Sequence, residues 1–119
     1  MKKILIADDE RSIRQTFKFF LEKEGYSVTV SEDAIQAFEL IKNEKFDLII
    51  TDCIMPKMSG LELLKKLRTN NNLTPVIVMT GEPTTKSQAY AFEIKASEYL
   101  SKPISKEQLI ESVKKVFKF

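Results

Sequence analysis

Five short apolar runs alternate along the chain with five longer segments of helical periodicity, and this alternation constrains the fold more than any other feature. It is typical of a parallel sheet that helices cover on both faces. The predicted strands are Ile4–Ala7, Ser27–Val30, Leu48–Thr51, Val76–Met79 and a weaker one at Glu98–Leu100. The third and fourth runs are apolar without alternation, as in strands buried on both faces. We therefore expect the first, third and fourth strands in the middle of the sheet.

The first two helices are predicted from the spacing of their apolar residues. The first carries apolar residues at intervals of three and four from Ile13 and ends near Gly25. The second is expected to begin at about Glu32, with Ser31 as its N-cap. The inner face of this second helix is predicted to contain Ala34, Ile35, Ala37, Phe38 and Ile41.

Capping signals place two of the remaining helices. Ser59 with Glu62, and Ser105 with Gln108, have the spacing of a capping box, so a helix should begin after each serine. The helix after Ser59 is expected to end at 70–72, where three asparagines follow one another. The helix expected over 85–94 has only a thin apolar face, and thinly packed elements move most easily.

The amino-acid composition limits the kinds of chemistry that the chain can perform. The 119 residues, 43% hydrophobic and 30% charged, match one soluble globular domain, expected over 1–119. There is no histidine, which excludes serine triads, histidine-ligated zinc and histidine proton relays. The single Cys53 cannot form an internal disulfide, and no run resembles a signal peptide or a membrane span. A cytoplasmic location and no membrane partner are expected, and the scattered net charge of +2 does not indicate nucleic-acid binding.

Polar residues follow four of the five strands. Right-handed crossovers bring the carboxyl ends of parallel strands to one edge of the sheet, where ligands bind. The residues expected at this edge are Asp8, Asp9 and Glu10 after the first strand, Asp52 after the third, Thr80 after the fourth, and Lys102 with Pro103 after the fifth. Taken singly, these are ordinary cap, turn or surface residues. Their joint placement after four strands indicates a site.

The predicted site suits a magnesium ion and an anion. Neighbouring aspartates repel one another unless a cation or protons neutralise them. Only hard oxygen ligands are present, which favours Mg²⁺, with Mn²⁺ as a substitute. Mg²⁺ commonly binds one or two carboxylates together with a phosphate oxygen. Lys102 and Thr80 would then contact the other oxygens of the anion, so the pattern indicates a phosphoryl site.

These motifs together resemble the receiver domain of two-component response regulators, including chemotaxis and sporulation-relay members. The resemblance covers essentially the whole chain and rests on Asp8 and Asp9 after ILIA, Asp52 in DCIMPKMSG, Thr80 with Gly81, and Tyr99 through Lys102 and Pro103. It implies a flavodoxin-like, three-layer α/β/α fold, with a five-stranded parallel sheet in the order 2-1-3-4-5 and five helices.

The resemblance implies roles for the acidic residues. Asp52 would accept a phosphoryl group from the phosphohistidine of a sensor histidine kinase or a histidine phosphotransfer protein. Asp9 would bind Mg²⁺ directly, Asp8 directly or through water, and Asp52 and the backbone carbonyl of Ile54 would complete the protein ligands. Such a domain supports its own phosphorylation and dephosphorylation but is not a conventional turnover enzyme.

The resemblance also implies a switch. Lys102 would pair with the phosphoryl oxygens, and the peptide bond to Pro103 would be cis. Thr80 would move toward the phosphoryl group, and Tyr99 would turn from solvent toward the core. This would reshape the face formed by the fourth helix, the fifth strand and the fifth helix. That face would contact an output domain or partner, or form a weak homodimer of an otherwise monomeric protein.

Three positions depart from the usual family pattern. Ile54 is bulky and apolar where many members are polar, and Glu82 is acidic; both are expected to tune the lifetime of the phosphoryl group. Lys95 stands where a glycine often precedes Ala96, which makes the end of the fourth helix harder to place. By the same resemblance the first helix, with Arg11, Arg14 and Gln15, is expected to dock the kinase.

Other functions stay open at this level. One is a Mg²⁺-dependent phosphatase or phosphotransferase that acts on small molecules through an aspartyl phosphate, but haloacid dehalogenase enzymes place a second aspartate where Ile54 stands. Another is a flavodoxin, which an acidic pocket does not suit. Within the receiver interpretation, a stand-alone relay and the receiver half of a DNA-binding or enzymatic regulator are equally compatible with the sequence.

Overall fold

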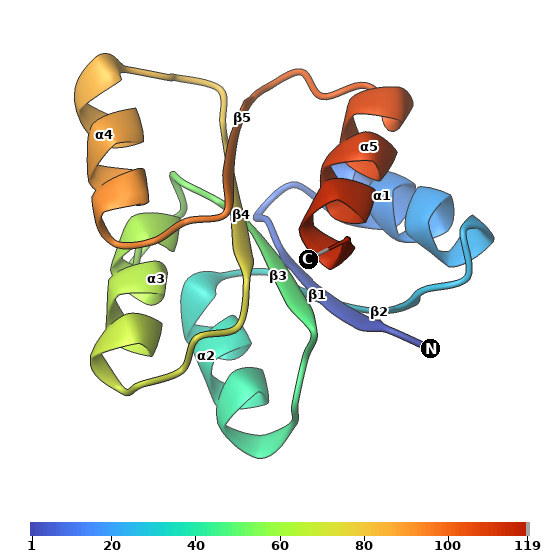
Figure 1. Ribbon diagram of the computed structural model, residues 1–119, viewed down its shortest axis with the longest axis horizontal. Coiled ribbons are helices and arrows are strands. Elements are labelled where there is room, and N and C mark those ends of the chain that lie inside the picture. Colours follow the sequence, from blue (N-terminus) through green and yellow to red (C-terminus); the bar gives the residue numbers. More distant parts are fainter. Residues whose placement is uncertain (119) are drawn as a thin grey trace.

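The computed structural model describes residues 1–118, and Phe119, the last residue of the expected domain, lies outside them. Five parallel strands form one sheet in the order β2-β1-β3-β4-β5, as predicted (Figure 1). The strands are β1 (Lys3–Ala7), β2 (Ser27–Ser31), β3 (Leu48–Asp52), β4 (Val76–Thr80) and β5 (Glu98–Ser101). The helices are α1 (Arg11–Lys23), α2 (Ala34–Asn43), α3 (Gly60–Thr69), α4 (Thr85–Glu93) and α5 (Lys106–Phe117).

The helices form two layers around the sheet. Helices α1 and α5 cover one face, and α2, α3 and α4 cover the other (Figure 1). Side chains of β1 alternate between the two resulting cores, with Ile4 and Ile6 facing α1 and α5, and Leu5 and Ala7 facing the other layer. Because both faces are covered, β3 and β4 are buried along their whole lengths, which explains their continuous apolar sequences.

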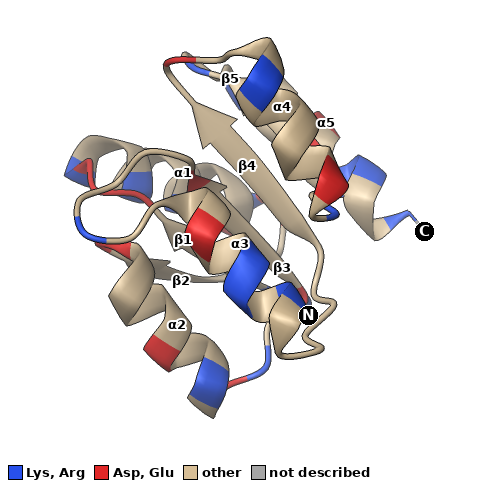
Figure 2. Cartoon of the chain, turned by 90° about the vertical axis from the view of Figure 1, so that its left-hand side faces the viewer, with Lys and Arg blue, Asp and Glu red and all other residues tan. Residues whose placement is uncertain are grey.

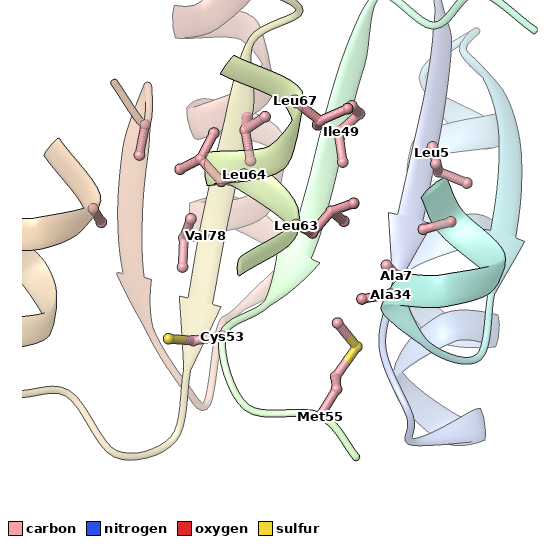
Figure 3. Close-up of a cluster of buried hydrophobic side chains, with 14 of the residues drawn as sticks. Leu5, Ala7, Ala34, Ile49, Cys53, Met55, Leu63, Leu64, Leu67 and Val78 are labelled. Atoms are coloured by element: carbon pink, nitrogen blue, oxygen red, sulfur yellow. The ribbon is translucent and has the colours of Figure 1, made fainter. Parts of the chain in front are cut away.

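The core between the sheet and helices α2 and α3 extends to the sheet edge at which the site is predicted. Leu63, Leu64 and Leu67 of α3 point onto β3 and β4, and Cys53 and Met55 extend this core beyond the end of β3 (Figure 3). Packed cores of this kind resist displacement. The backbone that follows β3 is therefore anchored from the helix side.

The predicted start of the second helix was wrong. Asp33, and not Ser31, caps α2, because its carboxylate accepts a hydrogen bond from the Gln36 amide at 2.8 Å. Ser31 is the last residue of β2. The helix therefore begins two residues later than expected. Ile35 was also placed wrongly on the inner face, since its side chain is 45% exposed.

The other helix ends follow the capping chemistry closely. The capping boxes of Ser59 with Glu62 and of Ser105 with Gln108 are both present. Helix α4 has a third capping box that the sequence analysis missed, between Thr84 and Ser87, and it ends at Glu93. Lys95 adopts a φ of 69°, the left-handed region that glycine favours, which fits the glycine that the resemblance suggested for this position.

Charges of both signs are spread along α2, α3 and α4, while the strands between them are largely uncharged (Figure 2). None of the helices described over residues 1–118 combines the length and the apolar character that crossing a bilayer requires.

Candidate functional site

The carboxyl ends of β1, β3 and β5 bring three charged side chains into direct contact. Lys102, just after β5, extends its ammonium between two carboxylates. Its Nζ donates to Asp8 Oδ2 at 2.9 Å and to Asp52 Oδ2 at 2.9 Å, and it lies 4.0 Å from the exposed Glu10. The Asp8 side chain is 0% exposed and that of Asp52 is 8% exposed. The fold therefore contains a buried bridge of one cation and two anions.

Asp9 adds a third carboxylate at the solvent side of this bridge. One oxygen each from Asp8, Asp9 and Asp52 lie within 4.8 Å of one another, and Asp9 is exposed while the other two are buried. Three hard oxygen donors on one open side form a donor set that suits Mg²⁺. The ammonium of Lys102 neutralises only part of the negative charge, so the residues present fit a bound divalent cation.

Backbone amides and one arginine hold the acidic side chains in place. Asp8 Oδ1 accepts from the Glu10 amide at 2.8 Å, and Asp52 Oδ1 accepts from the Ile54 amide at 3.2 Å. Arg14 of α1 donates to the backbone carbonyl of Asp8 at 2.8 Å. Asp8 is thus fixed through both its side chain and its carbonyl, and it does not serve as a side-chain cap of α1, whose N-cap is Glu10.

Gly60 is a structural part of the site that the sequence analysis missed. It is the first residue of α3, and its amide donates to the carbonyl of Cys53 at 2.9 Å. A Cβ on Gly60 would lie 2.9 Å from the carbonyl carbon of Asp52 and closer still to its oxygen. The signal was a glycine inside a helix directly after an N-cap serine, a position that helix propensity alone does not explain.

Burial and the neighbouring charges shift two pKa values in the bridge. Burial, assisted by the charge of Asp8, raises the pKa of Asp52 although its hydrogen bond to Lys102 opposes the shift. Burial disfavours the charged form of Lys102, but its hydrogen bonds to Asp8 and Asp52 and their charges together outweigh this and raise the pKa of Lys102. Lys102 therefore stays protonated at neutral pH, while the ionised form of Asp52 is disfavoured without a metal.

Asp52→Asn is expected to stabilise the metal-free protein at neutral pH, because asparagine imitates the uncharged carboxyl. A raised pKa in the folded state means that ionisation of Asp52 favours the unfolded chain. The stability advantage of the variant should be small below the usual carboxyl pKa of 3.8, grow as the pH rises through the raised value, and then level off. Urea unfolding of both proteins in EDTA, across this pH range, measures the difference in stability. A variant less stable than wild type at pH 7 contradicts a raised pKa of Asp52.

The remaining predicted residues lie around the bridge. Thr80 ends β4 beside β3, is 1% exposed, and its hydroxyl accepts from the Glu82 amide at 3.0 Å. The peptide bond between Lys102 and Pro103 is cis. The Ile54 side chain is 51% exposed, so it projects into solvent two residues beyond Asp52.

Tyr99 lies farther from the carboxylates, on β5. Its ring is half-buried and packs against the core beneath α2, α3 and α4. Its hydroxyl is hydrogen-bonded to that of Ser87 in α4. The sequence analysis did not single out Ser87.

A cluster of carboxylates around a largely buried lysine, at the carboxyl edge of a 2-1-3-4-5 sheet, is an arrangement that suits a phosphoryl group in an α/β domain. A family model described as "Response regulator receiver domain" matches residues 4–114. The chain belongs to this family and is a receiver domain of two-component response regulators, a signalling domain. The alternative of a small-molecule phosphatase is not favoured.

Relatives and solved structures agree with this assignment. The chain is 33% identical over 117 residues to the alkaline phosphatase synthesis transcriptional regulatory protein PhoP of Bacillus subtilis, which covers 98% of this chain and 49% of the relative. It is 32% identical over 108 residues to response regulator MprA of Mycobacterium sp. (strain KMS), covering 91% of this chain and 47% of the relative. The chain thus spans about half the length of these curated relatives.

Two solved structures are similar over nearly their whole length. The receiver domain of the Francisella response regulator 1452 has a TM-score of 0.94 at 36% identity and covers 99% of this chain and 98% of its own. The Vibrio cholerae chemotaxis protein CheY4 has a TM-score of 0.91 at 32% identity and covers 98% of both chains. The expected fold and family are confirmed.

Proposed function

We propose that Asp52 is the phosphoryl acceptor of this receiver domain. The observation that supports this proposal most strongly is the contact of Lys102 with both Asp52 and Asp8 at 2.9 Å, with Asp9 beside them. The donor is the phosphohistidine of a histidine kinase or phosphotransfer protein. A carboxylate oxygen of Asp52 forms the new P–O bond as the P–N bond of the donor breaks, and the imidazole leaves with the electron pair.

The neighbouring residues hold the ion and the group that is transferred. Asp8, Asp9 and Asp52, with the backbone carbonyl of Ile54, would hold Mg²⁺, which supplies positive charge that offsets the repulsion between the phosphoryl group and the carboxylates. Lys102 exchanges its contact with Asp52 for the phosphoryl oxygens. Thr80 donates its hydroxyl hydrogen to another of these oxygens. The same residues support dephosphorylation by water.

The phosphoryl group then controls the face formed by α4, β5 and α5. When the Thr80 hydroxyl turns toward phosphate it gives up the Glu82 amide, and Tyr99 fills the space beside it. Because a ligand shifts only a pre-existing equilibrium, some switched molecules exist without phosphate.

We place the domain, expected over 1–119, in the cytoplasm as the receiver part of a regulator or a stand-alone relay. PhoP is by name a transcriptional regulatory protein, which supports a DNA-binding output as one such arrangement. Weak pairing of two copies through the face formed by α4, β5 and α5 is compatible with either arrangement.

Ile54→Asn is expected to shorten the lifetime of the phosphoryl group several-fold. Ile54 projects from the acceptor loop into solvent, and its apolar side chain excludes the water that would attack phosphorus. Asparagine would admit and orient that water. The rate of phosphate release after removal of the donor measures the effect. Glu82→Gln is the matched change at the second position expected to tune the lifetime of the phosphoryl group. An unchanged rate in Ile54→Asn contradicts this role for Ile54.

The proposed function is tested by incubating the protein with Mg²⁺ and acetyl phosphate and measuring its intact mass. Wild type should gain one phosphoryl group, and Asp52→Asn should gain none. Glu10→Gln, which changes the neighbouring exposed carboxylate, serves as a control and should still be modified. Modification of Asp52→Asn to the wild-type extent, or no modification of wild type with Mg²⁺, would overturn the proposal.

A further inference from the structure

The loop between β4 and α4 is held by hydroxyl groups at both ends. At its start, Thr80 Oγ1 accepts from the Glu82 amide at 3.0 Å. At its end, Thr84 Oγ1 accepts from the Ser87 amide at 3.0 Å and caps α4. The first contact is the one that phosphorylation would break, because it uses the Thr80 hydroxyl. The second contact does not involve Thr80, so the end of the loop next to α4 keeps its cap when the Thr80 hydroxyl turns away.

Ser87 also connects the capped start of α4 to Tyr99, the tyrosine expected to switch. Its hydroxyl lies 3.4 Å from the Thr84 amide and 3.2 Å from the Thr84 carbonyl, and it is hydrogen-bonded to the hydroxyl of Tyr99. Tyr99 comes from β5, twelve residues farther along the chain. Helix α4 has only Ala91 fully buried, so a hydrogen bond to β5 is a substantial part of what fixes its first turn.

The hydrogen bond selects one position of the Tyr99 ring. With its hydroxyl on Ser87, the ring lies half-buried against the core beneath α2, α3 and α4. A tyrosine hydroxyl in such a place needs a partner, and it can regain one by turning to water if the partner is removed. Ser87 therefore stabilises this ring position, which occurs together with the Thr80 hydroxyl on the Glu82 amide, the arrangement expected without phosphate.

We propose that Ser87 is a positioning residue that biases the receiver toward its unphosphorylated conformation by holding the Tyr99 hydroxyl. The inference rests on the proposed function, in which the Tyr99 ring leaves this position as the Thr80 hydroxyl turns to the phosphoryl group. Coupling between two sites is reciprocal, so whatever favours the observed ring position also weakens binding of a phosphoryl analogue at Asp52. One neutral hydrogen bond corresponds to roughly a three- to tenfold change in that affinity.

The test is a double-mutant cycle of Ser87→Ala and Tyr99→Phe on the full chain. The readout is the beryllofluoride concentration that half-saturates the protein in Mg²⁺, followed by NMR of the backbone amides. Each single variant should lower this concentration about three- to tenfold, and the double variant no further, because both remove the same hydrogen bond. Ser87→Thr keeps a hydroxyl and should restore the wild-type value.

A separate variant distinguishes this role from helix capping. Thr84→Ala removes the N-cap of α4 but leaves the hydroxyls of Ser87 and Tyr99, so Tyr99→Phe should still strengthen binding in that background. Unchanged half-saturation in Ser87→Ala, or additive effects of Ser87→Ala and Tyr99→Phe, would overturn the role of Ser87 while leaving the proposed function intact. Failure of wild type to bind beryllofluoride at all would overturn both.

Discussion

Replacement of Lys102 by methionine should lower the free energy of unfolding of the metal-free protein by about 3 kcal/mol or more. The ammonium is the shared partner of Asp8 and Asp52, and all three side chains are at most 13% exposed. Without it, two buried carboxylates repel each other in a poorly solvated site. Breaking a buried ion pair from one side is costly because the partner charge stays behind uncompensated.

The pH and metal dependence of this variant separate charge from packing. The loss should be largest at neutral pH and shrink as the pH falls through the raised pKa of Asp52, because protonation removes the charge that lacks a partner. Mg²⁺ should recover part of the stability. Lys115→Met, at a pair whose lysine is 63% exposed, should change stability by less than about 0.5 kcal/mol. Equal losses in the two variants, by urea unfolding in EDTA, contradict a special role for Lys102.

The second large effect is expected from Gly60→Ala, which should cost about 2 to 3 kcal/mol of stability and slow phosphorylation of Asp52. The added methyl would collide with the backbone carbonyl of Asp52 and approach Thr51 Oγ1 to 2.9 Å. Backbone atoms cannot rotate away as a flexible side chain does. Either the start of α3 or the acceptor loop must shift, and a shift of that loop misaligns the Asp52 carboxylate.

Gly81→Ala is the matched control for this substitution. Gly81 follows Thr80 of the site, but a Cβ there meets nothing within 4 Å and no unusual φ is required. Its thermal stability should equal that of wild type, whereas Gly60→Ala should melt at a clearly lower temperature and take up phosphate from acetyl phosphate more slowly. If the two variants behave alike, the close packing of α3 on the acceptor strand does not shape the site.

The apolar runs alone predicted the strands and placed the first, third and fourth in the middle of the sheet, because continuous apolar strands and helical periodicity are strong local signals. The full order 2-1-3-4-5 came only from the resemblance to receiver domains. The sequence analysis placed the capping boxes at Ser59 and Ser105 correctly, since the chemistry of a capping box lies within four adjacent residues. It failed at α2, where Ser31 and Asp33 are both good caps and only the length of β2 decides between them. Pairing of strands is a long-range event that a local pattern does not contain.

The charged residues of the site were predictable because each follows a strand and the fold gathers strand ends. The three carboxylates do meet, and Lys102 lies among them. Two contributors were not foreseen. Gly60 matters through the absence of a side chain, and Ser87 through a contact with a residue twelve positions away. The sequence offered only the unusual place of Gly60 after an N-cap serine, and the close approach to Asp52 and the contact of Ser87 with Tyr99 appear only in the folded chain.

The most direct test of the central claim is to find which residue carries the phosphoryl group. The protein is incubated with Mg²⁺ and acetyl phosphate and reduced with borohydride, which converts an aspartyl phosphate to homoserine, and its peptides are then sequenced by mass spectrometry. We predict homoserine at position 52 and unmodified aspartate at 8 and 9, with no conversion when EDTA replaces Mg²⁺. Homoserine at position 8 or 9, or conversion at 52 that does not depend on the metal, would contradict the account.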